Sequence, residues 1–234
     1  MPSLLVNLAL VRTWYSPFGQ FLVSRIDNLL TTLSMGDDVR TLKCVLVGEE
    51  AVGKTSLIVS YTTNGFSDKY TPTAFDNYSV VVRVDKKPIR VQLCDTAGQS
   101  NLDSLRTLTY PDCDVFLVVY NVLNPETFKK VVDRWIPEIN KSNRHTPIVL
   151  VGTQTDRRWS ALDSQTVSTA KGKSLAAQIK AVDFFEVSSL TKGNVKMMFD
   201  AAIVAGLEGR RVIPKKSRLR QGFQRFVSIT KKVF

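Results

Sequence analysis

The run Gly48-Glu49-Glu50-Ala51-Val52-Gly53-Lys54-Thr55 decides the fold of this 234-residue chain. It fits the pattern G-x-x-x-x-G-K-[ST] of a phosphate-binding loop. The apolar run 42–47 precedes it and is typical of a buried strand, and residues 56–61 begin a helical pattern. Strand, loop and helix in this order are the context in which the pattern binds phosphate. The alternative, for this motif alone, is a glycine-containing turn that matches by chance.

The residue types in this loop suit a nucleoside polyphosphate. Gly48 and Gly53 let the backbone turn tightly, so that its N–H groups can face a phosphate. The helix that follows adds free N–H groups and the positive end of its dipole. The Lys54 side chain can reach the β- and γ-phosphates, and the Thr55 hydroxyl can ligate Mg²⁺. We therefore expect residues 48–56, Ser56 included, to bind nucleotide phosphates.

Composition indicates one folded domain with extensions. Hydrophobic residues make up 44% of the chain, which is enough for a sizeable core. Most of the net charge of +11 comes from residues 210–232, which hold nine basic residues and no acidic one. Cys44, Cys94 and Cys113 lie in or beside apolar runs, which indicates buried thiols in a reducing compartment rather than disulfides or a zinc site. No apolar run reaches the ~18 residues that a membrane-spanning helix needs.

The pattern of the sequence divides the chain into three parts. Residues 1–38 have apolar residues every three or four positions and fit two short amphipathic helices that Pro17 separates. This stretch is compatible with a mitochondrial presequence, a membrane-surface helix, or a poorly ordered extension ahead of a functional start near Met35. Residues 39–209 are expected to form the folded domain, and residues 210–234 a basic amphipathic tail.

Strand and helix patterns alternate from Arg40 onward. The expected strands are 42–47, 78–85, 89–95, 114–122, 147–153 and 184–187. The expected helices begin at 56 or span 126–139, 167–179 and 195–207, and the polar run 66–77 is expected to be a loop. This alternation predicts an α/β fold of the P-loop NTPase type, with a mostly parallel six-stranded sheet and helices on both faces. The ligand is then expected at the carboxyl ends of the strands.

Three further motifs follow predicted strands. In Asp95-Thr96-Ala97-Gly98-Gln99, the aspartate can hold Mg²⁺ through water, the Gly98 N–H can bond a γ-phosphate, and Gln99 can orient an attacking water. In Thr153-Gln154-Thr155-Asp156, the carboxylate can accept from the ring N–H and exocyclic amine of guanine, a pattern that adenine lacks. In Ser188-Ser189-Leu190, the backbone can close over the base. Each motif alone could be an ordinary loop, but four in this order favour a guanine-nucleotide site.

On these motifs the chain resembles a Ras-superfamily GTPase of the Rho family, nearest the Rac and cell-division-cycle branch, over residues 41–207. The most specific stretches are residues 70–78, 110–117 and 152–156. The resemblance implies GTP or GDP and Mg²⁺ as ligands. It implies that Thr73 ligates Mg²⁺ through its hydroxyl and the γ-phosphate through its N–H, that Phe66 packs on guanine, and that Tyr70 belongs to the nucleotide site. The implied catalytic residues are Gln99, Lys54 and Thr73, and the implied metal ligands are Thr55, Thr73 and Asp95.

The resemblance also implies partners. These are Rho-type effectors such as kinases and scaffold proteins, together with exchange factors and activating proteins, in membrane trafficking, actin organisation or cell polarity. Residues 73–78 would be the effector loop, and the stretch after Gln99 the second switch. We expect a peripheral protein of the cytosol and of the cytoplasmic face of the plasma membrane, endosome or Golgi, with no nucleic-acid partner.

The C-terminal tail is the expected membrane contact. Arranged as a helix, its last sixteen residues place apolar side chains on one face and basic ones on the other, which suits an anionic membrane surface. The alternative is a disordered basic tail that binds acidic partners or nucleic acid. The chain shows no C-terminal C-a-a-X, so no prenylation is expected.

Several positions depart from the family pattern. Glu50 stands where the family usually has glycine, Cys94 where it has tryptophan, and Ser100 and Leu102 where it has an acidic residue and a tyrosine. The helical insert of Rho proteins should lie between residues 156 and 188, a stretch shorter than usual. Glu50 predicts slow hydrolysis. The alternatives are a constitutively GTP-bound binding module, or a P-loop nucleoside kinase, which would need an Arg-rich lid and an acceptor site.

Overall fold

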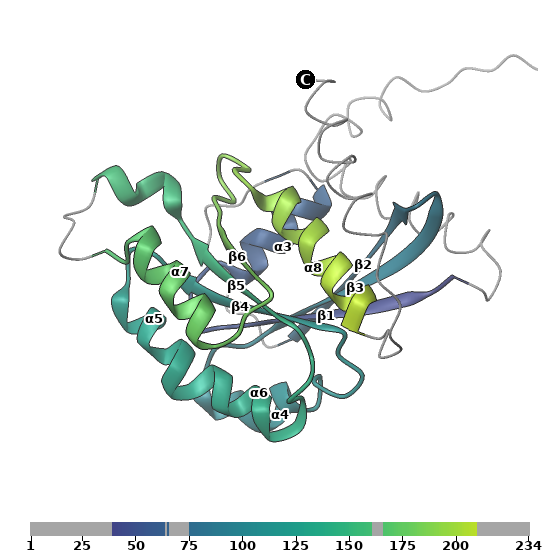
Figure 1. The fold of residues 1–234 in the computed structure, drawn as a ribbon, viewed down its shortest axis with the longest axis horizontal. Helices are drawn as coiled ribbons and strands as arrows, with labels where there is room; N and C mark the ends of the chain where they lie inside the picture. Colours follow the sequence, from purple (N-terminus) through teal and green to yellow (C-terminus); the bar gives the residue numbers. More distant parts are fainter. Residues whose placement is uncertain (1–38, 64, 66–74, 161–165, 210–234) are drawn as a thin grey trace, which may run out of the picture.

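A computed structural model describes residues 39–63, 65, 75–160 and 166–209. These residues form a six-stranded sheet in the order β2-β3-β1-β4-β5-β6 (Figure 1). The strands are β1 (Thr41–Val47), β2 (Phe75–Val84), β3 (Lys87–Thr96), β4 (Val115–Asn121), β5 (Ile148–Thr153) and β6 (Asp183–Glu186). Strand β2 is antiparallel to β3, and every other pair is parallel. The predicted fold class is confirmed.

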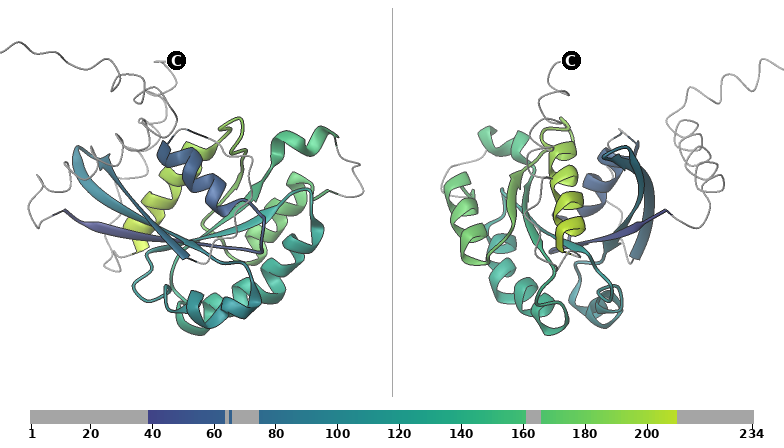
Figure 2. Two further views of the ribbon diagram at one scale, coloured as in Figure 1. Left: turned by 180° about the vertical axis from the view of Figure 1, so that it is seen from behind. Right: turned by 45° about the vertical axis from the view of Figure 1, so that its right-hand side comes forward.

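Helices cover both faces of the sheet. The α-helices are α3 (Lys54–Thr63), α4 (Asp103–Thr107), α5 (Pro125–Lys130), α6 (Ile136–Ser142), α7 (Thr169–Gln178) and α8 (Val195–Gly209). Short 3-10 helices form η1 (Ser100–Leu102) and η3 (Thr155–Ser160), and a π-helical turn forms η2 (Val131–Trp135). Figure 2 shows α3 and α8 on one face, with α5, α6 and α7 on the opposite one.

The central strands are buried because both of their faces are covered. On β1, Leu42, Cys44 and Leu46 pack into the core beneath α3 and α8, whereas Val45 and Val47 pack into the core beneath η2 and α7. Such strands have continuous apolar sequences rather than alternating ones. The three cysteines are buried free thiols, as expected. The carboxyl ends of β1, β3, β4 and β5 meet at one edge of the sheet, because these strands are parallel.

Two predictions about single elements are wrong, namely the end of one loop and the continuity of one helix. The loop expected at 66–77 ends earlier, since β2 begins at Phe75, which pairs with Thr96. The first three residues of β2 are exposed on an edge strand, so their sequence lacks the expected apolar alternation. The helix expected at 126–139 is interrupted by η2. Pro137 lacks the N–H that would bond the Asp133 carbonyl, and its ring would crowd that carbonyl, so the wider π-helical turn fits there.

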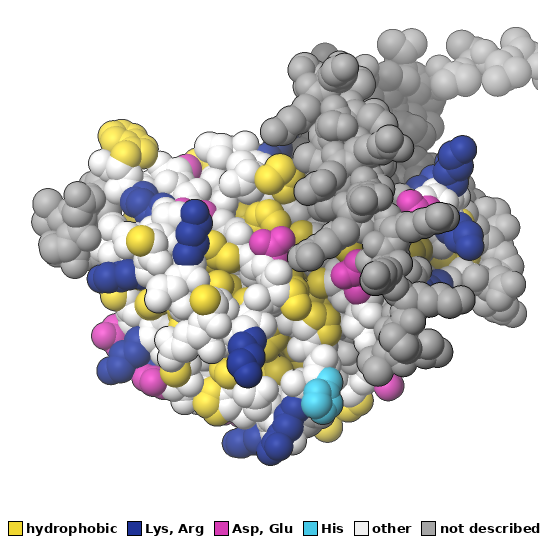
Figure 3. All heavy atoms as spheres, viewed as in Figure 1, with side chains coloured by type: hydrophobic (Ala, Val, Ile, Leu, Met, Phe, Trp, Pro, Cys, Tyr) yellow, Lys and Arg dark blue, Asp and Glu magenta, His cyan; other side chains and the backbone are white. Residues whose placement is uncertain are grey.

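Several expectations lie outside the described residues, namely the N-terminal amphipathic helices and the C-terminal tail. Among the described residues, no helix is long and apolar enough to cross a membrane. On the face shown in Figure 3, basic and acidic side chains are scattered among apolar and neutral ones. Among the described residues, this view shows no single basic patch.

Candidate nucleotide-binding site

The loop between β1 and α3 depends on two glycines with positive φ. Gly48 has φ +152° and Gly53 has φ +96°. A Cβ atom on Gly48 would lie 2.2 Å from the Val119 carbonyl oxygen, whereas one on Gly53 would meet nothing within 4 Å. Gly48 is therefore required for close packing on β4, and Gly53 for the conformation of its own backbone. Open space beside Gly53 leaves room for a ligand against the loop.

Lys54 is the first residue of α3, and its ammonium faces back into the loop. Its Nζ donates to the carbonyls of Gly48 at 2.8 Å and Glu49 at 2.9 Å. Burial lowers the pKa of the Lys54 ammonium to about 8, although the nearby Asp95 carboxylate opposes that shift. Among the described residues, Lys54 Nζ donates to these two carbonyls, which leaves one of its three N–H donors for a phosphate. An anion there would restore the stability of the charged form.

The expected magnesium ligands meet at the end of β3. The Thr55 hydroxyl donates to Asp95 Oδ2 at 2.5 Å, and the Asp95 side chain is fully buried. Hydroxyl and carboxylate oxygens are the donors that Mg²⁺ prefers. Within the described ranges, no group of three or more His, Cys, Asp or Glu side chains could hold a metal ion alone. The donor set fits a Mg²⁺ that completes its shell with phosphate and water oxygens.

The motif at the end of β3 lies directly against the phosphate-binding loop. A Cβ atom on Gly98 would be 2.3 Å from the Glu50 nitrogen and 2.4 Å from the Glu49 carbonyl carbon. The Thr96 hydroxyl donates to the Leu46 carbonyl at 2.6 Å, which ties the two strand ends together. The Gly98 backbone therefore lies directly beside the loop that is predicted to bind phosphate.

The two motifs expected at the base are also bonded to this loop and its helix. The buried Thr153 hydroxyl donates to the Val52 carbonyl at 2.6 Å. The Ser60 hydroxyl of α3 donates to the Ser189 carbonyl at 3.1 Å. The structure therefore brings all four predicted motifs to one edge of the sheet. Phe66, Tyr70 and Thr73 lie outside the described residues.

The motif predicted to recognise guanine includes Gln154, whose φ is 62°. Asp156 follows in η3 and is half-buried. Ser188 and Ser189 are buried, whereas Leu190 is exposed. Arg158 anchors η3 through an ion pair with Glu186 at 2.5 Å, and this bond lowers the pKa of the Glu186 carboxyl against the effect of burial. Sequence reasoning did not identify Arg158, because its partner lies 28 residues away on β6.

The Gln99 side chain meets Glu50. Its Nε2 donates to Glu50 Oε1 at 3.3 Å in an exposed position. Glu50 thus occupies the space beside the glutamine that was predicted to orient water. This arrangement can compete with a water molecule for the amide of Gln99.

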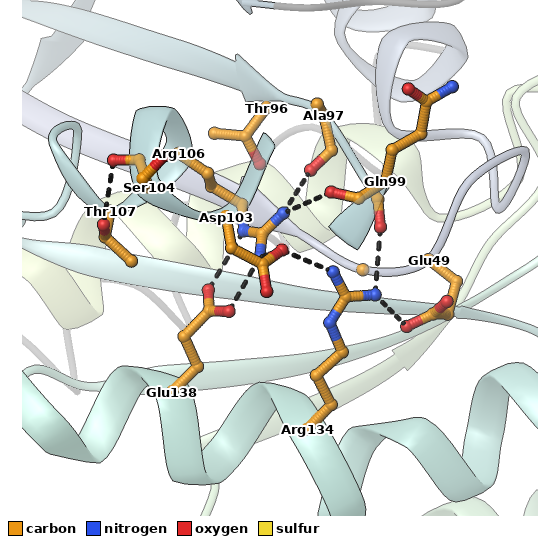
Figure 4. Close-up of polar contacts among 12 residues, drawn as sticks. Glu49, Thr96, Ala97, Gln99, Asp103, Ser104, Arg106, Thr107, Arg134 and Glu138 are labelled. Atoms are coloured by element: carbon orange, nitrogen blue, oxygen red, sulfur yellow. Dashed lines mark hydrogen bonds and ion pairs between the residues drawn. The ribbon is translucent and has the colours of Figure 1, made fainter. Parts of the chain in front are cut away.

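Two arginines that the sequence did not single out hold the backbone of the same segment (Figure 4). Arg106 donates to the Ala97 carbonyl at 2.9 Å and to the Gln99 carbonyl at 3.3 Å. Arg134 donates to the Gly98 carbonyl at 3.0 Å. Both arginines belong to helical segments that give no local signal of a functional role.

Comparison with known proteins agrees with this geometry. A family model described as "Ras family" matches residues 43–207. The chain belongs to the Ras family of small GTPases. Its curated relatives include the Rho-related GTP-binding protein RhoV of Homo sapiens and of Bos taurus, each 46% identical over 184 residues, or 75% of this chain and 78% of the relative. Within the Ras family, the chain is therefore Rho-related.

Family membership establishes the broad chemistry. Ras-family proteins are GTPases that bind guanine nucleotide with Mg²⁺, and Rho-related members act through effectors, exchange factors and activating proteins. In this Rho-related GTPase, the phosphate-binding loop and the motif after β3 lie against each other. Glu50 departs from the family pattern, and the two arginines lie outside the four motifs.

The buried Lys54 makes a testable prediction about protons. Phosphate stabilises its ammonium form, so GDP binding should raise its pKa from about 8 and take up protons above that pH. GDP affinity should consequently fall as pH rises through this range. Calorimetry of GDP binding at about pH 9, in buffers of different ionisation enthalpy, measures the uptake well above the titration of phosphate, whose second pKa is ~6. The ring N–H of guanine also titrates near this pH and contributes uptake in both forms, so Lys54→Arg, which stays protonated, should reduce the uptake. Equal uptake in both forms would contradict the assignment.

Proposed function

We propose that this chain is a Rho-type molecular switch of the Rac and cell-division-cycle branch, with slow GTP hydrolysis. The observation that carries the proposal is the convergence of all four motifs on one sheet edge, with the Thr55–Asp95 pair beside Lys54. Such a switch orders its effector loop with GTP and releases it after hydrolysis. Its partners would be kinases and scaffold proteins of membrane trafficking, actin organisation or cell polarity.

Each site residue has a proposed role in hydrolysis. Lys54 binds the β- and γ-phosphates, and the Gly98 N–H holds a γ-phosphate oxygen. Gln99 orients the water that attacks the γ-phosphorus in line with the leaving GDP. Thr55 and Asp95, with Thr73, would hold a Mg²⁺ that neutralises charge on the phosphates when bound. The protein forms no covalent bond with the phosphoryl group in this reaction, so positioning and charge stabilisation supply most of the catalysis.

Glu50 supports the slow rate within this proposal. Its carboxylate accepts from the Gln99 amide and so opposes the orientation that a water molecule needs. Its negative charge also lies where charge on the transferring phosphoryl group must be stabilised. The same contact favours the second candidate, a GTP-held binding module with negligible hydrolysis. The two candidates differ only in the rate that remains.

Removal of the Glu50 side chain should therefore accelerate hydrolysis. We expect Glu50→Gly to raise the single-turnover rate and to make the protein respond to a Rho-type activating protein, whose arginine contributes ~10³–10⁵ in rate. Glu50→Gln is the matched control, because it keeps the size and removes the charge. A rate restored by glycine but not by glutamine assigns the effect to crowding. Wild-type protein that an activating protein stimulates normally would contradict the proposal.

Asp156 should set the base specificity of the site. Its carboxylate is proposed to accept from the ring N–H and exocyclic amine of guanine, so Asp156→Asn should weaken GDP binding and strengthen binding of XDP, which carries a carbonyl in place of the amine. Equilibrium titration of both nucleotides measures the change. Asp133→Asn, on an exposed carboxylate of η2, is the control and should keep the GDP preference. An unchanged preference in Asp156→Asn would remove Asp156 from this role.

The C-terminal tail, which lies outside the described residues, is proposed to attach the protein to anionic membranes. Arranged as a helix, its sequence places apolar residues on one face and basic residues on the other. The first set is Leu219, Phe223, Phe226, Val227, Ile229, Val233 and Phe234, and the second is Arg218, Arg220, Arg225, Lys231 and Lys232. Each basic residue near an anionic leaflet contributes roughly 1 kcal/mol.

Co-sedimentation with phosphatidylserine vesicles tests this attachment. We expect binding that weakens at high salt and that is lost in the double variant Phe223→Ser with Phe226→Ser, whose charge is unchanged. Vesicles of neutral lipid are the control. If the double variant binds as well as wild type, the attachment is electrostatic alone and the amphipathic helix is wrong.

A further inference from the structure

Three successive carbonyl oxygens after β3, those of Ala97, Gly98 and Gln99, accept hydrogen bonds from Arg106 and Arg134. We propose that Arg134 is a positioning residue for GTP hydrolysis, which acts by holding the Gly98–Gln99 peptide in place. The inference rests on the proposed role of Gln99 in orienting water. It adds a residue of η2 that lies outside all four nucleotide motifs.

Arg134 joins three separate segments of the chain. One nitrogen, Nη1, bonds Glu49 of the phosphate-binding loop at 2.9 Å and the Gly98 carbonyl at 3.0 Å. The other, Nη2, bonds Asp103 of α4 at 2.7 Å. The guanidinium is planar and rigid, so these bonds fix the three segments relative to one another. A residue with one point of attachment could not do this.

Arg106 supports the same segment from a buried position. Its side chain is fully buried and pairs with Glu138 of α6 at 2.7 Å and with Asp103 at 2.6 Å. Burial alone would lower the pKa of Arg106, but the bonds from Glu138 and Asp103 raise it above its usual value. The guanidinium therefore stays charged while it holds the Ala97 and Gln99 carbonyls. Asp103 Oδ1 accepts from both arginines and joins them.

Trp135 gives the two arginines a rigid support. Its ring is fully buried, and the guanidinium carbons of Arg106 and Arg134 lie 4.6 Å and 4.4 Å from the ring centroid. Cation–π contact of this kind adds attraction and restricts the tilt of each guanidinium. Arg134 and Trp135 are consecutive residues of η2, so the π-helical turn positions both side chains.

The geometry of the peptide bond connects these contacts to hydrolysis. In a trans peptide the N–H points away from the C=O, so a bond to one sets the direction of the other. Arg106 on the Ala97 carbonyl therefore directs the Gly98 N–H, which is proposed to bind the γ-phosphate. Arg134 bonds the Gly98 carbonyl and so fixes the orientation of the peptide that joins Gly98 to Gln99. Small displacements of a positioned group can cost ~10²-fold in rate.

A double-mutant cycle on the full chain tests the inference. Single-turnover GTP hydrolysis is measured for Arg134→Gln, Gln99→Leu and the double variant, both in the wild type and with Glu50→Gly to raise the rate. We expect Arg134→Gln to slow hydrolysis about tenfold, and to change the rate less than about twofold once Gln99 is leucine. GDP affinity and melting temperature are measured on the same proteins. Arg134→Lys keeps the positive charge but lacks the two Nη groups that bond Glu49, Gly98 and Asp103 together, so it should recover only part of the rate.

A second readout does not depend on hydrolysis. Amide hydrogen exchange in the segment 97–102 of the GDP-bound protein should be faster in Arg134→Gln than in wild type. Arg144→Gln is the matched control, because Arg144 lies beyond α6 and its Nε donates to the Asn140 carbonyl close by. It should change neither the exchange nor the rate.

The outcomes separate the inference from the proposed function. If Gln99→Leu leaves the hydrolysis rate unchanged, the proposed role of Gln99 is wrong, and the inference that Arg134 acts on hydrolysis through Gln99 is overturned with it. If Gln99→Leu slows hydrolysis and Arg134→Gln does not, the inference is wrong and the proposed function stands. Arg134→Gln could instead slow hydrolysis equally with glutamine and with leucine at position 99, and also weaken GDP binding and lower the melting temperature. That result would assign Arg134 a structural role and overturn the inference.

Discussion

A backbone contact that leaves no room for a side chain sets the dimensions of the nucleotide site. Gly98 lies so close to the phosphate-binding loop that a Cβ atom would be 2.3 Å from the Glu50 nitrogen. A larger residue would push the two loops apart. Because Asp95 precedes Gly98 by three residues on the same strand end, such a shift would also strain its bond with Thr55. The proposed metal ligands and the segment of Gln99 therefore share one constraint.

Because the phosphate-binding loop lies against residues 97–99, Glu50 contacts the side chain of this segment's Gln99, whereas the two arginines contact its backbone. Glu50 lies on the loop that Gly98 contacts, and its carboxylate reaches the side chain of Gln99. Arg106 and Arg134 reach the backbone carbonyls. A side chain can change its rotamer while hydrogen bonds to its backbone hold the loop in place. Under the proposed function, a substitution at position 50 would therefore act on the Gln99 side chain and leave the backbone contacts of the two arginines in place.

Charge compensation distinguishes the arginine cluster from Lys54. Arg106 and Arg134 are paired with three carboxylates, those of Glu49, Asp103 and Glu138. Their charge is satisfied within the protein, so this cluster has little to gain from an anion. The Lys54 ammonium instead faces backbone carbonyls, and burial lowers its pKa. A phosphate would relieve that cost, which explains why the buried cation without a full partner lies in the loop and the compensated ones lie behind it.

Local patterns in the sequence were sufficient for the strands, the main helices and the four motifs, because each depends on residues that are close in the chain. Hydrophobic periodicity follows from burial on one face or both, and Gly48, Gly53 and Lys54 serve one loop. Their order along a parallel sheet also predicted that they would meet at one edge.

Only the tertiary structure decided how that site is supported. Arg134 meets Glu49 across 85 residues, and Arg106 meets Glu138 across 32, so no local pattern marks either pair. The π-helical turn at η2 and the start of β2 at Phe75 likewise depend on what packs or pairs against them. Ion pairs, stacking and edge pairing are contacts between surfaces that exist only after folding, and a single sequence does not show which surfaces will meet.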